Sequence, residues 1–267
     1  MSGIAVHNVS MVFRGRTGEV RAIDDVSLEI PDAHFACIVG ASGCGKSTLL
    51  NVMAGLVRPT SGTVTVDGDE VHEPGADRGM VFQTYTLYPW LRVRENVEFG
   101  LKLKRMRAAE RRKISDSLLA EMGLTEFARA YPKELSGGMR QRVAIARALA
   151  NEPKVLLMDE PFGALDALTR ASAQAFLTGI WEQHRRTIAF VTHDIDEAIF
   201  LGDTIYVMSR RPGRIREVVE VGIPRPRSLD DVGTQGFAEL KHRILSLIFE
   251  ETDGGGAPGS NEQPSVR

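Results

Sequence analysis

The part of the chain best suited to chemistry is the segment GASGCGKST, residues 40–48, which follows the apolar run HFACIV. It fits the pattern G-x-x-x-x-G-K-[ST] through Gly40, Gly45, Lys46 and Ser47. Glycines let successive backbone N–H groups turn toward one phosphate chain, and a helix that begins there points its positive end at the same place. A tight glycine-rich turn is the simpler alternative, but the lysine and serine in register favour a site for a nucleoside triphosphate.

Roles within this loop follow from the chemistry of phosphate. The Lys46 ammonium can reach the outer two phosphates, and the Ser47 hydroxyl can bind Mg²⁺. Cys44 would lie near the helix N-terminus, which favours the reactive thiolate, so we expect its alkylation to block turnover; a small packing residue is the alternative. The residues expected to contact the nucleotide are Gly40, Ala41, Ser42, Gly43, Cys44, Gly45, Lys46, Ser47 and Thr48.

Two acidic residues follow a second apolar run, in the segment VLLMDEP. A strand that ends in Asp159 would place this carboxylate at the carboxyl edge of a parallel sheet, where the Mg²⁺ of a bound nucleotide can be held. Glu160 comes next and can orient or deprotonate the attacking water. Two solvated acids at a strand end are the alternative, which the upstream phosphate loop disfavours. The sequence thus predicts Asp159 as a metal ligand and Glu160 as a catalytic residue.

Strands and helices that alternate along the chain would position these groups. Residues 4–9 and 26–30 alternate as strands do and indicate a hairpin-like N-terminal sheet. Further strands are expected at residues 35–39, 62–66, 78–83, 155–158, 187–192 and 204–209, and a helix at residues 46–55. This alternation predicts an α/β fold with a partly parallel sheet.

Residues 84–135 have a helical pattern instead. Ile114, Leu118 and Met122 recur at helical spacing, and Ser136 is a suitable N-cap for a helix over the segment SGGMRQRVAIARALA. We therefore expect a helical subdomain, about residues 84–150, inserted in a domain that spans residues 1–250. Residues 251–267 have the composition of a disordered tail. The basic run KLKRMRAAERRK is expected to be a solvated helix face, with contact to lipid headgroups or a partner as the alternative.

Composition excludes several classes of protein. The 267 residues are 43% hydrophobic and 25% charged, which is typical of a soluble globular protein. A net charge of -2 gives no reason to expect nucleic acid as a partner. We expect no signal peptide, and no stretch approaches the about 20 apolar residues that cross a bilayer. Any role at a membrane is therefore expected to come through a partner.

The segment LSGGMRQR, residues 135–142, together with the phosphate loop and MDEP, resembles the nucleotide-binding subunit of an ABC transporter. The resemblance covers about residues 4–250. It implies ATP as the nucleotide and a P-loop NTPase core of ABC ATPase type, with an N-terminal antiparallel β subdomain and an inserted helical subdomain. At matching positions it implies that Gln83 contacts the metal and that His193 contacts the γ-phosphate. Phe13 would stack on adenine, although the loop RGRTGEV that follows it is longer than usual.

The resemblance also implies that the chain acts as a pair of copies. Ser136, Gly137 and Gly138 would form an anion site at a helix N-terminus, but the phosphate loop of the same chain lies elsewhere. In this family a head-to-tail dimer places each signature against the ATP held by the other copy. Asp166, in the segment GALD, would cross the dimer interface. Met139 stands where glutamine is commonest; because backbone and serine groups contact the phosphate, we expect activity to survive.

Two longer segments narrow the resemblance. EPGADRGMVFQTYTLYPWLRVRENVEFGL and VTHDIDEAIFLGDTIYVMSRRPGRI are similar to ATPases of the nitrate, taurine and aliphatic-sulfonate importer group. Such a subunit would bind two integral-membrane permease subunits at the cytoplasmic face of the bacterial plasma membrane, and through them an extracytoplasmic solute-binding protein. The permeases are expected to dock near residues 83–91, with Trp90 either in the docking groove or in the core.

Two other functions stay open at this point. A soluble ABC ATPase of DNA repair or of the ribosome is one alternative, and a nucleotide-binding scaffold without turnover is the other. A single phosphate loop, a single signature and the lack of a sustained heptad repeat disfavour the first. Glu160 and His193 together disfavour the second.

Overall fold

The computed structural model describes residues 3–15, 18–84 and 86–253. Its central feature is a six-stranded sheet with the strand order β10-β9-β3-β8-β7-β6. These strands are β3 (Phe35–Gly40), β6 (Arg78–Val81), β7 (Val155–Asp159), β8 (Thr187–Val191), β9 (Thr204–Met208) and β10 (Ile215–Glu220). Neighbouring strands are parallel except for β10, which runs antiparallel to β9. The predicted strands are confirmed, and β10 is an addition that the sequence pattern did not indicate.

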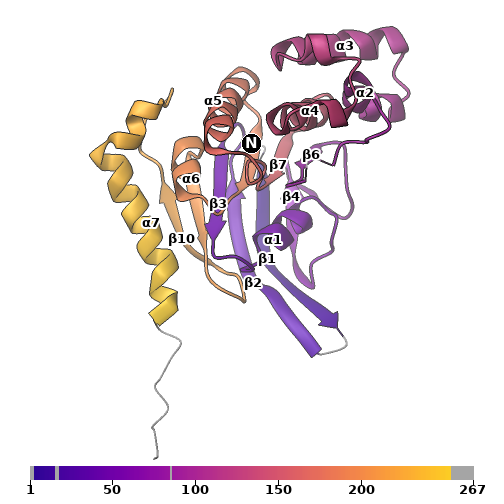
Figure 1. Cartoon of the computed structure of the whole chain (residues 1–267). Coiled ribbons are helices and arrows are strands. Elements are labelled where there is room, and N and C mark those ends of the chain that lie inside the picture. The colour runs from indigo at the N-terminus through magenta and orange to yellow at the C-terminus, as the bar shows by residue number, and fades with distance from the viewer. Residues whose placement is uncertain (1–2, 16–17, 85, 254–267) are drawn as a thin grey trace, which may run out of the picture.

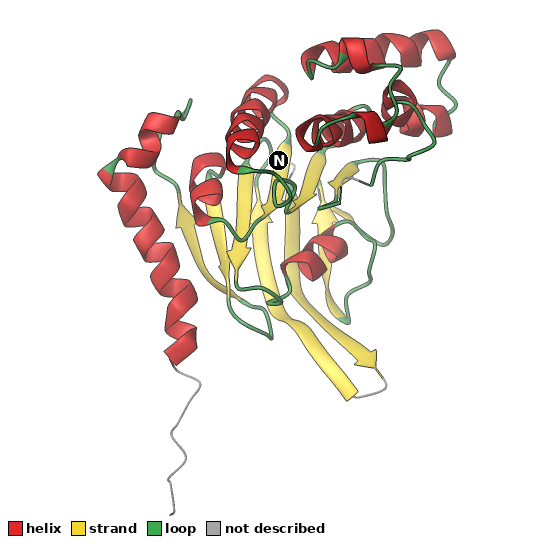
Figure 2. Cartoon of the chain, in the orientation of Figure 1, coloured by secondary structure: helices red, strands yellow, loops and turns green. Residues whose placement is uncertain are grey.

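Both faces of this sheet are buried, which explains why its strands are continuous apolar runs. Successive side chains of a strand point to opposite faces. In β3, Phe35, Cys37 and Val39 therefore belong to one hydrophobic cluster, while Ala36 and Ile38 belong to another. The sheet is the middle layer of the molecule, and its two faces are covered by different structures (Figure 2).

An antiparallel sheet covers one face, as predicted from the N-terminal residues. It has the order β2-β1-β4-β5 and consists of β1 (Ile4–Gly15), β2 (Gly18–Ile30), β4 (Ser61–Val66) and β5 (Asp69–Glu70). Helix α1 (Lys46–Met53) shares the same hydrophobic cluster through Leu49, Leu50 and Met53. Because α1 follows the phosphate loop directly, this layer holds the loop against the edge of the central sheet.

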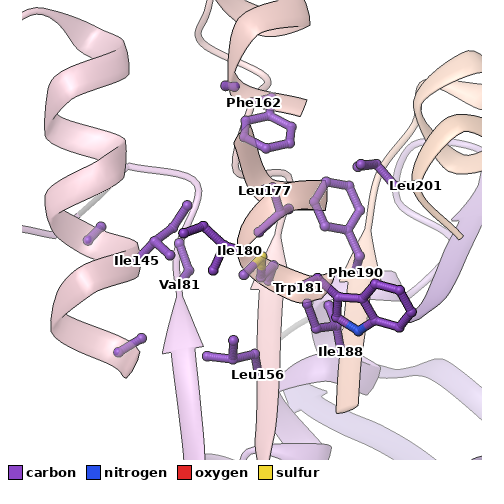
Figure 3. Packing of buried hydrophobic residues seen from close by; sticks show 14 of the residues in the cluster. Val81, Ile145, Leu156, Phe162, Leu177, Ile180, Trp181, Ile188, Phe190 and Leu201 are labelled. Carbon is purple, nitrogen blue, oxygen red and sulfur yellow. The ribbon is translucent and has the colours of Figure 1, made fainter. Parts of the chain in front are cut away.

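Helices cover the other face. They are α5 (Ala167–His184), α6 (Ile195–Leu201) and α7 (Gln235–Asp253), with a short 3-10 helix η3 (Leu229–Gly233) before α7. Phe190 of β8 is the centre of an aromatic cluster, with its ring centroid 5.7 Å from that of Phe162 and 5.8 Å from that of Phe35 (Figure 3). Trp181 of α5 closes the cluster edge-on against Phe35 at 6.1 Å. This packing fixes the strand ends that carry the predicted site.

Three further helices form a group at one end of the molecule, apart from α7 (Figure 1). They are α2 (Val93–Leu103), α3 (Ala108–Glu121) and α4 (Gly137–Leu149), joined by the 3-10 helices η1 (Thr125–Phe127) and η2 (Pro132–Glu134). The group corresponds to the helical part expected at about residues 84–150. Helix α4 continues from it onto the central sheet, since Val143 and Ile145 belong to the cluster of the helical face.

The start of the helical region differs from the expectation. Helix begins at Val93 rather than near residue 84, because a loop wraps around the buried side chain of Asn96. The Asn96 Oδ1 accepts a hydrogen bond from the Tyr88 N–H at 2.8 Å, and its Nδ2 donates to the carbonyl of Leu91 at 3.0 Å. These bonds satisfy backbone groups that a helix would otherwise pair. Pro89 also lacks the N–H that a helix interior needs.

The C-terminal region was only partly predicted. Helix α7 was not indicated by the sequence reasoning, and it extends to Asp253, three residues into the stretch expected to be a tail. Residues 254–267 of that expected tail lie outside the described residues. Within residues 3–15, 18–84 and 86–253, no helix is long and apolar enough to cross a membrane.

Candidate active site

The parallel register brings the predicted chemical groups to one edge of the sheet. In the pairing of β3, β8 and β7, Val191 lies opposite both Ile38 and Asp159. The phosphate loop after β3, the acids at the end of β7 and His193 just after β8 therefore emerge side by side. This is the carboxyl edge of a parallel sheet, where ligands of such folds bind.

The phosphate loop is held tightly between neighbouring backbones. Gly45, the N-cap of α1, has φ 110°, and a methyl group placed on it would lie only 2.8 Å from the carbonyl oxygen of Ala22 in β2. Only glycine fits this position without strain. The side chain of Lys46 is buried, and its Nζ donates to the carbonyls of Gly40 at 2.8 Å and Ala41 at 3.1 Å. These two hydrogen bonds hold the ammonium group at the phosphate loop.

Ser47 and Asp159 meet across the strand ends. The Ser47 hydroxyl donates to Asp159 Oδ1 at 2.9 Å. Burial raises the pKa of Asp159, and the neighbouring Glu160 carboxylate adds to that rise, while the Ser47 hydrogen bond and Lys46 oppose it. A hydroxyl and a carboxylate oxygen are hard donors that suit Mg²⁺, which keeps several waters and takes few protein ligands besides phosphate oxygens. This pair fits that donor set.

Glu160 and His193 form a pair of their own. His193 Nδ1 lies 2.9 Å from Glu160 Oε2. Glu160 has φ 42°, an uncommon conformation for a residue with a side chain, and its amide donates to the carbonyl of Val191 at 2.9 Å. Gln83 is close by: a methyl group placed on Gly163 would lie 3.7 Å from Glu160 Oε2 and 3.8 Å from Gln83 Nε2. The structure therefore brings all three polar side chains together.

A cavity of about 260 Å³ lies above the phosphate loop. Glu160 and Arg211 line it, and the remaining lining residues are Ser42, Gly43, Gly45, Lys46, Ser47 and Thr48. The predicted loop residues and the predicted catalytic acid thus share one space. Arg211 was not predicted, because it is distant in sequence from every motif.

The signature residues and Asp166 lie together but are not among the residues that line this cavity. Ser136 caps α4 by accepting a hydrogen bond from the Met139 N–H at 3.3 Å. Asp166 caps α5, accepting from the Thr169 N–H at 3.0 Å and from its hydroxyl at 2.7 Å, and these bonds lower the pKa of Asp166. A methyl group placed on Gly138 would lie 2.9 Å from Thr169 Cγ2, so the two capped helix starts are in contact.

The burial of three predicted residues, Phe13, Cys44 and Trp90, bears on their expected roles. Phe13 lies on β1 with 43% of its surface exposed and is likewise not among the cavity-lining residues. Cys44 is buried, with its Sγ 3.9 Å from Lys46 Nζ, which favours the alternative of a small packing residue; that alkylation of Cys44 blocks turnover stays a prediction. Trp90 is 70% exposed, which excludes the alternative that it is a core residue.

Arg170 is a further residue that sequence reasoning missed. It lies one turn after Asp166 on α5, and its Nη2 donates to the carbonyl of Leu165 at 3.1 Å. Its Nη1 lies 3.3 Å from Oδ2 of Asp194, the residue that follows His193 and caps α6. Arg170 therefore joins the segment around Asp166 to the segment around His193. Its spacing from Asp166 was the only available signal, and that spacing alone does not identify a contact between segments.

Comparisons with known proteins agree with this geometry. The profile of the ABC transporter family matches residues 23–163. The nitrate import ATP-binding protein NrtD of Synechocystis is 52% identical over 83% of the chain and 83% of its own length. The taurine import ATP-binding protein TauB of Rhizobium johnstonii is 47% identical over 94% of the chain and 98% of its own length.

A solved structure has the same fold. It is a dimeric ATP-binding cassette in a post-hydrolysis state, bound to ADP and Pi, which is 36% identical and superposes with a TM-score of 0.72 over 82% of the chain and 98% of its own. The expected ABC ATPase fold is thereby confirmed. The chain belongs to the ABC transporter family, as one of its ATP-hydrolysing subunits.

Proposed function

We propose that this ATP-hydrolysing subunit energises the import of a small solute of the nitrate, sulfonate or taurine type, or of a similar small organic anion. The observation that carries the ATP-hydrolysing part of the proposal is the contact between Glu160 and His193, because Glu160 also lines the cavity at the phosphate loop. The relatives named for nitrate and taurine import support an importer of a small solute that carries an anionic group. The permease subunits and the solute-binding protein, rather than this subunit, would select the cargo.

ATP would lie in the cavity with its outer phosphates beside Lys46. Ser47, Asp159 and Gln83 would hold Mg²⁺, which neutralises charge on the outer phosphates when bound. An ionised carboxylate can only accept hydrogen bonds, so His193 donates through Nδ1 to Glu160. This bond orients the Glu160 carboxylate, which then positions the attacking water and takes up its proton. Lys46 balances the negative charge that develops during transfer.

Two copies of the chain would form the working unit. The first turns of α4 and α5 present exposed groups: Ser136, Asp166 and Leu168, whose side chain is 80% exposed. The backbone N–H groups at the start of α4 suit a phosphate that the same chain does not supply. A second copy could supply it, and the dimeric state of the similar cassette supports this arrangement.

The surface for the membrane subunits would lie over α2 and the loop before it. Tyr88, Trp90 and Phe99 form an aromatic group there, with ring centroids 5.6 Å apart for Tyr88 and Trp90 and 4.4 Å apart for Tyr88 and Phe99. Two hollows adjoin Phe99, of about 440 and 260 Å³. Trp90 is exposed and its two aromatic neighbours are half-buried. An exposed tryptophan beside a hollow is typical of a docking site. The loop also carries Gln83, so the docking surface and one expected ligand of Mg²⁺ share one segment.

The expected permease partners determine where the subunit would work. A subunit that binds permeases and uses ATP would work peripherally at the cytoplasmic face of the bacterial plasma membrane, with an extracytoplasmic solute-binding protein as an indirect partner. A soluble ABC ATPase without a permease is the alternative function.

Co-purification tests the proposal. The tagged chain would be extracted from membranes of its host in mild detergent, and its partners identified by mass spectrometry. We expect a multi-span permease with the unmodified chain and with Val218→Glu, a change at an exposed residue of β10 remote from the aromatic group. We expect the permease to be lost with Trp90→Glu. Recovery of soluble partners alone, with ATP hydrolysis intact, would contradict the importer and favour the alternative.

A further inference from the structure

The cavity over the phosphate loop contains a cationic residue to which no motif assigns a role. Arg211 lines it, and a methyl group placed on Gly43 would lie 4.0 Å from Arg211 Nη2. Within the part of the chain that the structure describes, this guanidinium has no hydrogen bond or ion pair. Lys46, by contrast, is bonded to two loop carbonyls. Arg211 is therefore a positive charge that faces the cavity with its donors available.

The turn that carries Arg211 is firmly held. It spans residues 209–214 between β9 and β10, and the Ser209 hydroxyl oxygen accepts a hydrogen bond from the Arg214 N–H at 2.9 Å. Gly213 donates to the carbonyl of Ala22 at 3.0 Å and accepts from the Asp24 N–H at 3.0 Å. The side chain of Arg214 is in turn paired with the Asp24 carboxylate, with Nε 3.0 Å from Oδ2. These contacts fasten the turn to β2.

The same turn also touches the phosphate loop. A methyl group placed on Gly213 would lie 2.1 Å from the carbonyl oxygen of Cys44 and 2.8 Å from Met208 Cε. The absence of a side chain at this position thus allows the two backbones to pack directly against each other. None of these contacts involves the Arg211 side chain. The turn therefore places the guanidinium beside the phosphate loop, and the guanidinium is not needed to hold the turn in place.

Strand order separates Arg211 from Glu160 and His193 on opposite sides of β3. Glu160 follows β7 and His193 follows β8, which both lie on one side of β3 in the sheet. Arg211 follows β9, which lies on the other side of β3. A nucleotide whose outer phosphate is beside Glu160 and His193 therefore directs its inner phosphates, toward the nucleoside, to the side of Arg211.

We propose that Arg211 binds the inner phosphates of the nucleotide and so contributes to the affinity for both ATP and ADP. The planar guanidinium offers several N–H donors in a fork that matches phosphate oxygens, and such charge-assisted bonds are strong. This inference rests on the proposed use of the cavity for ATP. ADP keeps the inner phosphates after hydrolysis. The proposed contact of Arg211 therefore predicts an effect on ADP binding as well as on ATP binding.

Calorimetric titration tests this role. Purified chain would be titrated with ADP and Mg²⁺, and with ATP and Mg²⁺ in the Glu160→Gln background, which prevents turnover. Arg211→Gln is expected to weaken both nucleotides by a similar factor, about tenfold. Arg211→Lys, which keeps the charge and loses the fork, should weaken them less. Arg210→Gln is the matched control, because Arg210 is an adjacent arginine of the same turn that does not line the cavity.

The outcomes separate this inference from the proposed function. ADP binding by Arg211→Gln within about twofold of the unmodified chain would overturn the role of Arg211 and leave the ATP site standing. Weaker ATP binding with unchanged ADP binding would also overturn it, because the contact would then be to the outer phosphate. An equal loss in Arg210→Gln would show a general charge effect and likewise contradict it. If the unmodified chain bound neither nucleotide, the ATP site itself would be refuted.

Discussion

His193 Nδ1 lies 2.9 Å from Oε2 of Glu160, although 33 residues separate them in the chain. The two side chains follow neighbouring parallel strands, β8 and β7, and the register of these strands brings them together. The side chain of Glu160 is 21% exposed and that of His193 is 58% exposed, so the pair forms part of an open edge rather than of the core. A water and a phosphate can therefore reach it.

His193, beside the expected place of the γ-phosphate, is expected to act mainly in turnover, by orienting Glu160, and to contribute little to the affinity for nucleotide. Replacing it with alanine should lower the turnover number by up to about 100-fold, because a misdirected carboxylate no longer positions the water. The affinity for nucleotide should change little. Single-turnover hydrolysis and a binding titration measure these quantities separately, and His193→Gln, whose side-chain amide keeps an N–H donor, provides the matched variant. A large loss of affinity with normal turnover would contradict this role.

Arg170 is expected to position His193 through Asp194. Arg170→Ala should reduce the turnover number by about tenfold while leaving the KM for ATP nearly unchanged, since Arg170 is not among the residues that line the cavity at the phosphate loop. Arg170→Lys keeps a charge beside Asp194 but loses the bond to the Leu165 carbonyl, so we expect partial recovery. The measurement is a comparison of turnover number and KM in the three proteins. Equal turnover would show that the contact is structural only.

The ionised Asp159 carboxylate is expected to lower the stability of the folded, nucleotide-free chain. Burial raises its pKa, so the folded chain binds its proton more tightly than the unfolded chain does. The resulting stabilisation is present at low pH and is lost as the pH rises through the raised pKa. At pH 7 the carboxylate is ionised at a cost, and Asp159→Asn should therefore raise the melting temperature, by about 2–4 °C.

Two controls define the test of Asp159. The melting difference between Asp159→Asn and the unmodified chain should shrink toward pH 4, where protonation removes the charge from Asp159 as well. Asp159→Asn should also lose the gain in melting temperature that MgATP gives the unmodified chain. A lower melting temperature for Asp159→Asn at pH 7 would contradict the account.

Gly213 is expected to be intolerant of any side chain. Gly213→Ala would place a methyl group 2.1 Å from the Cys44 carbonyl, so either the turn or the phosphate loop must move. We expect weaker nucleotide binding, by about tenfold or more, together with a lower melting temperature. Gly222→Ala is the control, since a methyl group there would meet no atom within 4 Å. Equal nucleotide affinities for the two variants would show that the turn does not hold the loop.

Local motifs explain why much of the site could be predicted. The phosphate loop needs glycines, a lysine and a serine in a fixed order, and Asp159 with Glu160 follows an apolar strand. Each of these two motifs is contained in a segment of at most nine consecutive residues. The sheet was predictable for a similar reason, because parallel strands buried on both faces are continuous apolar runs.

What could not be predicted depends on contacts between distant segments. Asn96 determines where the helical region starts, because it bonds to backbone groups of a loop that precedes it. Arg211 and Arg170 enter the site through a turn after β9 and through a contact between α5 and Asp194, and neither belongs to a local pattern. The burial of Cys44 likewise results from the packing of the loop against Gly40, where a methyl group would lie 3.0 Å from the Cys44 Sγ.

The most direct test of the central claim is hydrolysis of radiolabelled ATP by the unmodified chain and by Glu160→Gln, with nucleotide affinity measured on the same preparations. Glu160→Gln keeps the shape of the side chain and removes its basicity. The account predicts an unchanged affinity for MgATP and a rate of hydrolysis lower by about 100-fold or more. Hydrolysis by Glu160→Gln at the rate of the unmodified chain would show that the catalytic base lies elsewhere and would contradict the account.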